Sequence, residues 1–172
     1  MAKTLVIYYS RKGENYFRGS IKSIEKGNTE MAAEYIRDAV GADLFEVKTV
    51  KEYSADYTRC TEEAQAELRN NERPELTEYI DDIDGYDNIV VAGPCWWGTY
   101  PMAIFSQLDR LDFTGKKVFP LITHEGSGLA GSSAALKKHC VGAEVGKGIA
   151  VHGSEVENSR QAIEKWAKEN HL

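Results

Sequence analysis

Leu5-Val6-Ile7-Tyr8-Tyr9-Ser10, together with Gly27-Asn28-Thr29-Glu30, is the part of the sequence that decides the fold. The first stretch is an apolar run rich in β-branched and aromatic residues, which predicts a buried strand. The second opens a helix that Asn28 or Thr29 could cap, and its apolar face then repeats at Ala32, Tyr35, Ile36 and Ala39. A strand, a polar loop and a helix N-terminus together favour an anion, because free N–H groups point outward there.

Strand and helix patterns alternate along the rest of the chain, which is typical of an α/β protein with a parallel sheet. Strands are predicted at about 4–9, 44–47, 88–93, 117–122 and 148–151. Helices are predicted at about 29–40, ended by a Gly41 cap, and at 56–70, from 101 onward, 130–140 and 156–170. We therefore expect one domain over residues 1–172, a doubly wound five-stranded parallel sheet of order 2-1-3-4-5. Its ligand should lie beyond the carboxyl ends of the strands.

The composition of the chain excludes several classes of protein. The 172 residues carry a net charge of −6, which argues against a nucleic-acid surface. Three cysteines, Cys60, Cys95 and Cys140, have no paired spacing, so neither a disulfide framework nor a metal site is indicated, and Cys60 is expected in the core. We find no signal peptide and no membrane-spanning run, and we expect a cytoplasmic protein, monomeric or homodimeric.

Three loops should converge at the predicted crevice, and two of them follow the third and fourth strands. In Pro94-Cys95-Trp96-Trp97-Gly98, two adjacent tryptophans cannot both enter the core, so one is expected beside the crevice, where a planar ligand could stack on it. The glycine-rich stretch from Thr123 to Ser132 allows a close approach of its N–H groups to a ligand. A packed surface aromatic and a flexible glycine loop are the simpler interpretations of these two segments.

Ser10 with Gly27-Asn28-Thr29-Glu30 resembles the phosphate loop of flavodoxins, and the two later loops resemble the flavin-ring loops of the same family, with Trp97-Gly98 the best match. The resemblance implies non-covalently bound FMN. It also implies that the peptide before Gly98 can turn its carbonyl toward the flavin ring. The residues it assigns to the cofactor are Ser10, Gly27, Asn28, Thr29, Pro94, Cys95, Trp96, Trp97, Gly98, Thr123, Glu125, Gly126, Ser127 and Gly128.

The chain departs from ordinary flavodoxins at two points. The loop from Thr123 to Ser132 has no tyrosine or tryptophan, which predicts a less covered flavin face. Residues 11–26 interrupt the phosphate loop, and they concentrate positive charge in an otherwise acidic chain. We expect this insertion to turn back as a hairpin around Gly19 and to lie beside the phosphate end of the crevice. A solvated flap is the simpler alternative.

Several functions fit these features. The first is an electron carrier that passes single electrons to a redox partner protein, as in flavodoxins. The second is an enzyme, an NAD(P)H-dependent reductase of a small acceptor such as a quinone, which the less covered flavin face favours. The third is a binding module without a cofactor. A phosphorelay receiver would need acidic residues after the first strand, where Tyr9-Ser10 stand. A low-molecular-weight tyrosine phosphatase would need Cys and Arg around the first loop, whereas Cys95 is on the third strand. Nor is there a serine-hydrolase arrangement around His124.

Overall fold

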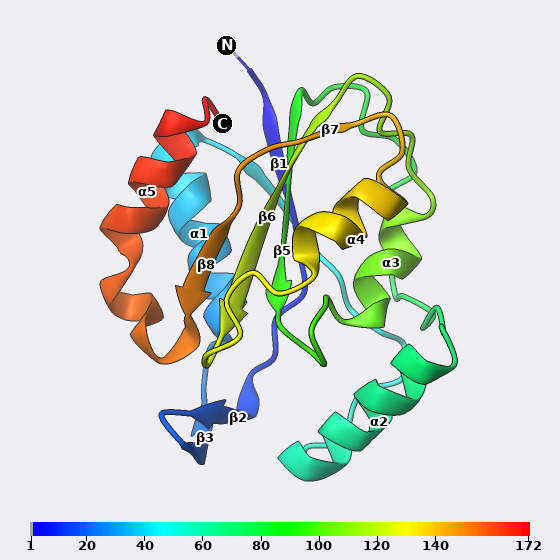
Figure 1. Cartoon of the computed structure of the whole chain (residues 1–172), viewed down its shortest axis with the longest axis vertical. Coiled ribbons are helices and arrows are strands. Elements are labelled where there is room, and N and C mark those ends of the chain that lie inside the picture. The colour runs from blue at the N-terminus through cyan, green and yellow to red at the C-terminus, as the bar shows by residue number, and fades with distance from the viewer. Residues whose placement is uncertain (1) are drawn as a thin grey trace.

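A parallel sheet runs through the middle of the computed structural model, which describes residues 2–172 (Figure 1). Its strands are β1 (Thr4–Tyr8), β4 (Asp43–Glu46), β5 (Asn88–Pro94), β6 (Lys117–His124), β7 (Glu144–Val145) and β8 (Ile149–His152). They lie in the order β4-β1-β5-β6, and β7 and β8 both pair in parallel with β6. The predicted α/β fold of order 2-1-3-4-5 is confirmed.

Strand β1 lies between β4 and β5 and is buried on both faces. Leu5 and Ile7 point into one hydrophobic core, and Val6 and Tyr8 point into the other. Successive side chains of a strand alternate between faces, so an apolar run without alternation is what a doubly covered strand requires.

Helices cover both faces of the sheet (Figure 1). The bounds of the helices are α1 (Asn28–Val40), α2 (Tyr57–Arg69), α3 (Met102–Leu108), α4 (Ser132–His139) and α5 (Arg160–Glu169). Helices α1 and α5 pack on one face, and α3 and α4 pack on the other. Helix α2 lies toward the end of the molecule to which β5 and β6 point, and its bounds match the prediction, with the Asp56 carboxylate accepting the Arg59 N–H as an N-cap.

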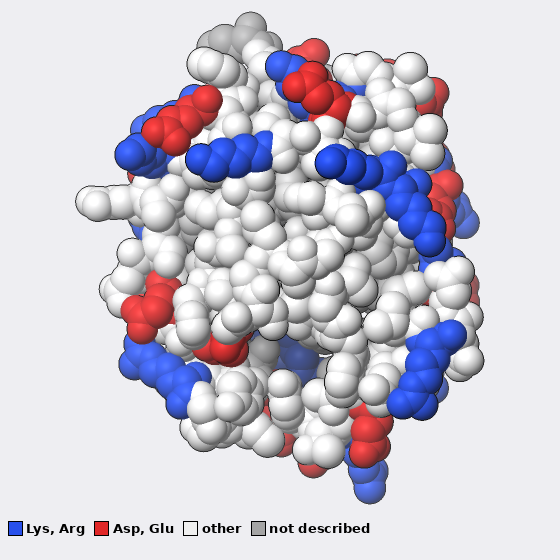
Figure 2. Space-filling model, in the orientation of Figure 1, with Lys and Arg blue, Asp and Glu red and all other residues white. Residues whose placement is uncertain are grey.

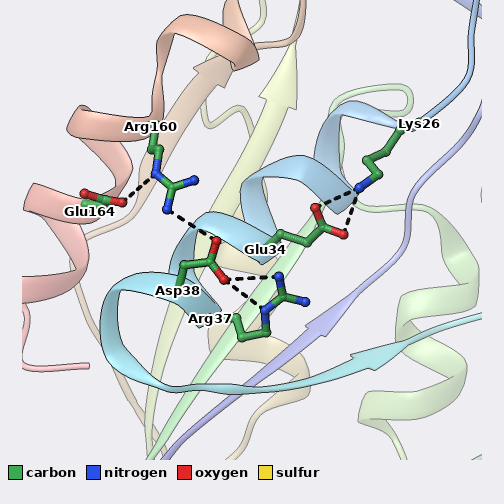
Figure 3. Close-up of polar contacts among 6 residues, drawn as sticks. All are labelled: Lys26, Glu34, Arg37, Asp38, Arg160 and Glu164. Atoms are coloured by element: carbon green, nitrogen blue, oxygen red, sulfur yellow. Dashed lines mark hydrogen bonds and ion pairs between the residues drawn. The ribbon is translucent and has the colours of Figure 1, made fainter.

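Helices α1 and α5 are joined at the surface by a chain of ion pairs (Figure 3). The Arg160 guanidinium reaches Asp38 at 3.3 Å and Glu164 at 2.8 Å. These side chains are exposed, and exposed pairs contribute little to stability. The contact between the two helices therefore depends on the apolar residues beneath, among them Ile36, Ile163 and Trp166.

The start of α1 differs from the prediction. Neither Asn28 nor Thr29 caps the helix, because Gly27 occupies the N-cap position and makes no side-chain cap. The hydroxyl of Ser10 takes over this role and accepts the Glu30 N–H at 3.0 Å. The Gly41 cap at the other end is confirmed, with φ of 70° and its N–H bonded to the Arg37 carbonyl at 2.8 Å.

The fifth strand position is split in two, which the sequence reading missed. Strand β7 pairs with the start of β6 and β8 with its end. Between them, Gly146 and Gly148 run so close to Phe119 and Pro120 that a Cβ at either glycine would collide with those side chains. Pro120 also has no N–H to donate to a ladder. The pairing of the fifth strand position with β6 is therefore interrupted between β7 and β8.

Three other helix starts also differ from the prediction. Helix α4 begins at Ser132 rather than Ala130, because residues 125–131 form bends and turns. The last predicted helix divides into a 3-10 turn, η1 (Gly153–Asn158), followed by α5. Helix α3 begins one residue after the predicted Pro101, which is its N-cap.

Residues 11–26 form the predicted hairpin. Strands β2 (Gly13–Phe17) and β3 (Ser20–Ile24) pair antiparallel, and the turn lies at Arg18 and Gly19, with φ of 52° and 85°. Two consecutive residues with positive φ are typical of the two-residue turns that match strand twist.

Among residues 2–172, none of the helices has the length and apolar character that crossing a bilayer requires.

A buried amide on α3 holds the middle of the long connection between α2 and β5. The Gln107 side chain, fully buried on α3, donates to the Ile80 carbonyl at 2.7 Å and accepts the Ile80 N–H at 2.9 Å. We expect Gln107→Leu to lower the free energy of unfolding by about 1–3 kcal/mol, because both Ile80 backbone groups lose their partner. Urea unfolding measures this. The control, Gln161→Leu on the exposed side of α5, should change stability by less than about 0.5 kcal/mol. Equal losses in the two variants would contradict the assignment.

Candidate functional site

The carboxyl ends of β1, β5 and β6 meet at one edge of the sheet, and a pocket of about 440 Å³ opens there. Edges of this kind are where doubly wound sheets bind their ligands. Figure 2 shows the molecule hollowed toward its lower end, with a basic group visible in the depth of the hollow. The pocket is lined by Arg11, Asn15, Tyr16, Asn28, Tyr57, Cys60, Thr61, Ala64, Pro94, Cys95, Trp96, Trp97, Thr123, His124, Glu125, Ser127 and Gly153.

The structure brings eight of the predicted cofactor residues to the pocket wall: Asn28, Pro94, Cys95, Trp96, Trp97, Thr123, Glu125 and Ser127. The other six lie behind or beside the wall: Ser10, Gly27, Thr29, Gly98, Gly126 and Gly128. Their backbone positions still shape the three loops.

The first loop is closed by the contact between Ser10 and Gly27. A Cβ at Gly27 would lie far inside van der Waals contact with the Ser10 hydroxyl and 2.9 Å from the Arg11 carbonyl oxygen. Thr29 is buried, and its hydroxyl shares a hydrogen bond of 2.8 Å with the hydroxyl of Thr123. Thr29 thus links α1 to the end of β6, while Asn28 lines the pocket.

The second loop is a tight turn at Trp97 and Gly98. The Trp96 N–H donates to the Thr99 carbonyl at 2.8 Å, and the two central residues have φ of 55° and 84°. A bulky residue with positive φ is uncommon and marks a constrained position. The Trp97 indole N–H donates to the Thr61 carbonyl on α2 at 2.9 Å, and the Gly131 N–H donates to the Gly98 carbonyl at 2.9 Å.

The two tryptophans have different roles. Trp96 is half-buried and packs edge-on against Tyr9 and Tyr53, with ring centroids 5.2 and 5.1 Å away. Trp97 has 51% of its surface exposed and is held at the pocket by α2. The expectation that one tryptophan lies beside the crevice is confirmed.

The third loop carries a histidine whose role the sequence did not indicate. The Nδ1 atom of His124 accepts the Gly126 N–H at 2.8 Å, which requires that nitrogen to be unprotonated. Partial burial, and next the neighbouring His152 imidazole, lower the pKa of His124 below its usual 6.5. Any proton of the neutral ring is therefore on Nε2, the nitrogen that is not held by Gly126.

Glu125 brings a negative charge into the same pocket. Its carboxylate accepts the Ser154 N–H at 3.0 Å and the Ser154 hydroxyl at 3.3 Å, and it is paired with His152. These donors belong to the turn after β8. At the preceding position, Gly153, a Cβ would come within 2.6 Å of the Asn28 amide nitrogen. The turn and the start of α1 are thus in direct contact.

Two further walls of the pocket come from the hairpin, which the sequence analysis expected beside the crevice, and from α2, which it did not place there. The hairpin contributes Asn15 and Tyr16, and α2 contributes Tyr57, Cys60, Thr61 and Ala64. These α2 residues share one helical face at the spacing i, i+3, i+4, i+7, and the sequence analysis placed only Cys60 among them, in the core. Cys60 and Ala64 are indeed buried, and burial raises the pKa of the Cys60 thiol to about 11, so it stays protonated at neutral pH.

Arg11 is the basic residue of the pocket wall, and it fastens the hairpin. Its guanidinium donates to the carbonyls of Glu14 and Ser54, both at 2.9 Å, and to that of Ala55 at 3.3 Å. Among the described residues no carboxylate lies within ion-pair distance of Arg11, so its charge is not cancelled by a direct partner.

Comparison with known proteins assigns this arrangement to a family. The sequence matches the family described as Flavodoxin over residues 16–170, and the chain therefore belongs to the flavodoxin family. A comparison with curated protein sequences finds no match.

Similar solved structures support the same assignment. A protein of Bacteroides eggerthii assigned as a flavoprotein has a TM-score of 0.77 at 24% identity, covering 100% of this chain and 99% of that one. A protein of Bacteroides uniformis, also assigned as a flavoprotein, has a TM-score of 0.75 at 27% identity, and the match covers 97% of this chain and 98% of that one. A flavoprotein of Lactobacillus acidophilus in complex with FMN has a TM-score of 0.64 at 26% identity, and the match covers 92% of this chain and 98% of that one.

We expect His124 to titrate below pH 6.5, the usual value for histidine. Because the folded pKa is lower than the unfolded one, the unfolded chain binds the proton first as the pH falls through 6.5. This residue therefore lowers the stability of the fold below that pH and has no such effect above it. NMR titration of the imidazole measures the pKa. His152→Gln removes the neighbouring ring and should raise the pKa of His124. A midpoint above 6.5 in the unaltered protein would contradict the arrangement.

Proposed function

We propose that this pocket binds FMN non-covalently and that the chain transfers electrons through it. The observation that carries the proposal is a single pocket that combines a helix N-terminus with an immobilised, half-exposed indole, Trp97. The first suits a phosphate and the second suits a planar ring. Membership of the flavodoxin family supports the same cofactor. When bound, FMN supplies the electron chemistry, and the protein supplies orientation and electrostatics.

The residues at the start of α1 fit a phosphate group. Asn28 lines the pocket, and the absence of a side chain at Gly153 lets the Asn28 amide pack against that turn. The N–H groups of Asn28 and Thr29 and the side-chain amide of Asn28 are donors without charge, and the Arg11 guanidinium adds a positive charge to the pocket. Glu125 opposes it, but this carboxylate already accepts two hydrogen bonds from Ser154 and is paired with His152. The donor set therefore suits an anion.

The remaining loops fit the ring. Trp97 offers an exposed aromatic face, and its orientation is fixed by the bond to Thr61 before any ligand arrives. Thr123, His124 and Ser127 place polar groups on the facing loop, where a flavin has carbonyl oxygens and ring nitrogens. A site whose polar groups are held in advance loses less entropy on binding.

We expect Asn28→Ala to weaken FMN binding about ten- to hundred-fold and riboflavin binding much less, because the lost bond is to the charged phosphate. Fluorescence titration of both flavins measures this. The control, Asn70→Ala at the exposed end of α2, should leave both affinities unchanged. Equal losses for both flavins would remove Asn28 from the phosphate site, and binding of neither flavin by the unaltered protein would leave a binding module without a cofactor.

Two roles for the bound flavin compete. As a carrier, the chain would pass single electrons to a redox partner protein. As an enzyme, it would be an NAD(P)H-dependent reductase of a small acceptor such as a quinone. The tight turn at Trp97 and Gly98 favours the carrier, because its peptide could follow the redox state of the ring. The second role is favoured by the walls that α2 and the hairpin add to the pocket.

We expect a redox titration to resolve two one-electron midpoint potentials and expect Gly98→Ala to bring them closer together. A side chain at φ of 84° strains the turn by about 1–2 kcal/mol and disfavours one peptide orientation. Gly115→Ala is the matched control, since Gly115 also has positive φ and open space but lies at the other end of β6. Both variants should lose similar stability, and only Gly98→Ala should shift the potentials. A single two-electron step with rapid bleaching by NADPH would favour the reductase.

A further inference from the structure

The hairpin and α2 meet in an aromatic stack at the mouth of the pocket. The rings of Tyr16 and Tyr57 lie 6.4 Å apart at an angle of 27°, and both side chains line the pocket. Tyr16 keeps 44% of its surface exposed. Stacked rings of this kind leave one face open, and a further planar group can extend the stack.

The wall beside this stack is uncharged and fixed in place. On α2, Tyr57, Cys60, Thr61 and Ala64 face the pocket at helical spacing. Trp97 fastens one end of this wall through the Thr61 carbonyl, and Arg11 fastens the hairpin to the residues just before α2. A concave, largely apolar wall with few polar groups is typical of a small-molecule site.

The proposed flavin site does not account for these residues. The two ends of the first loop and the loops after β5 and β6 supply the groups that suit phosphate and ring, whereas Tyr16 belongs to the hairpin inserted into the first loop and the α2 residues come after β4. Arg11 lies on the hairpin side and has no carboxylate partner among the described residues. Its charge favours an occupant with an anionic or carbonyl edge.

We propose that Tyr16, Tyr57 and the pocket face of α2 form a second subsite, which binds a planar aromatic acceptor of the quinone class next to the flavin. Tyr16 stacks on the acceptor, and Arg11 faces its polar edge. This inference rests on the proposed FMN function for the source of electrons, but the binding of the acceptor is testable separately. The pocket shape favours a small molecule over a protein at this subsite.

The test is isothermal titration of the FMN-saturated protein with anthraquinone-2-sulfonate, a planar quinone with an anionic edge. We expect saturable binding that Tyr16→Ala weakens about five- to ten-fold, with FMN affinity unchanged, and that Tyr16→Phe retains. Ile21→Ala is the matched control, because Ile21 is the cross-strand neighbour of Tyr16, is equally exposed and does not line the pocket. This control should bind the quinone as the unaltered protein does.

Three results would overturn the subsite. They are equal quinone affinity in Tyr16→Ala and the unaltered protein, release of FMN by the quinone, and a loss of FMN affinity in Tyr16→Ala that matches the loss of quinone affinity. The last would mean that the tyrosines cover the flavin itself. If the protein binds no FMN, the same titration on the unloaded protein applies: binding that depends on Tyr16 would uphold the subsite while the proposed FMN function fails.

Discussion

The close contact between Ser10 and Gly27 is the constraint on which the site depends. It joins the end of β1 to the start of α1 although residues 11–26 lie between them in sequence. Only glycine fits, because a Cβ at position 27 would collide with the Ser10 hydroxyl and the Arg11 carbonyl. With the ends of the insertion pinned, the intervening chain can leave and return as a hairpin. The Ser10 hydroxyl, at the same time, holds the Glu30 N–H and so fixes the first turn of α1.

The hairpin then becomes a structural part of the pocket. Its turn is tied to η1, because Arg18 donates to the Ser154 carbonyl at 3.2 Å and pairs with Glu155 at 2.8 Å. Its base is tied to the chain before α2 through Arg11. An isolated two-stranded hairpin is marginal in water, so these contacts and the Tyr16 stack are what stabilise it here.

The sequence predicted what depends on local pattern. Buried runs such as Ile89-Val90-Val91-Ala92 identified the strands, and apolar residues on one side of the helix, such as Tyr57, Cys60 and Ala64, identified α2, because burial leaves a signal in nearby residues. It missed what depends on distant contacts. Strand β7 is too short to show a pattern, the Ser10 cap comes from another element, and Tyr16 and Tyr57 meet only in three dimensions. The absence of an aromatic in residues 123–132 thus gave an incomplete picture of the pocket, since aromatic residues reach it from elsewhere.

The turn at Trp97 shows how these distant contacts maintain a strained conformation. A tryptophan in the left-handed region costs about 1–2 kcal/mol relative to ordinary backbone. The indole bond to Thr61 and the bond from Gly131 to Gly98 each contribute about 0.5–1.5 kcal/mol, which is enough to offset that cost. The donors and acceptors come from α2 and from the loop before α4, so the orientation of the indole is set by both neighbouring elements. Any movement of α2 would therefore also move the aromatic face at the pocket, which couples the uncharged wall to the ring site.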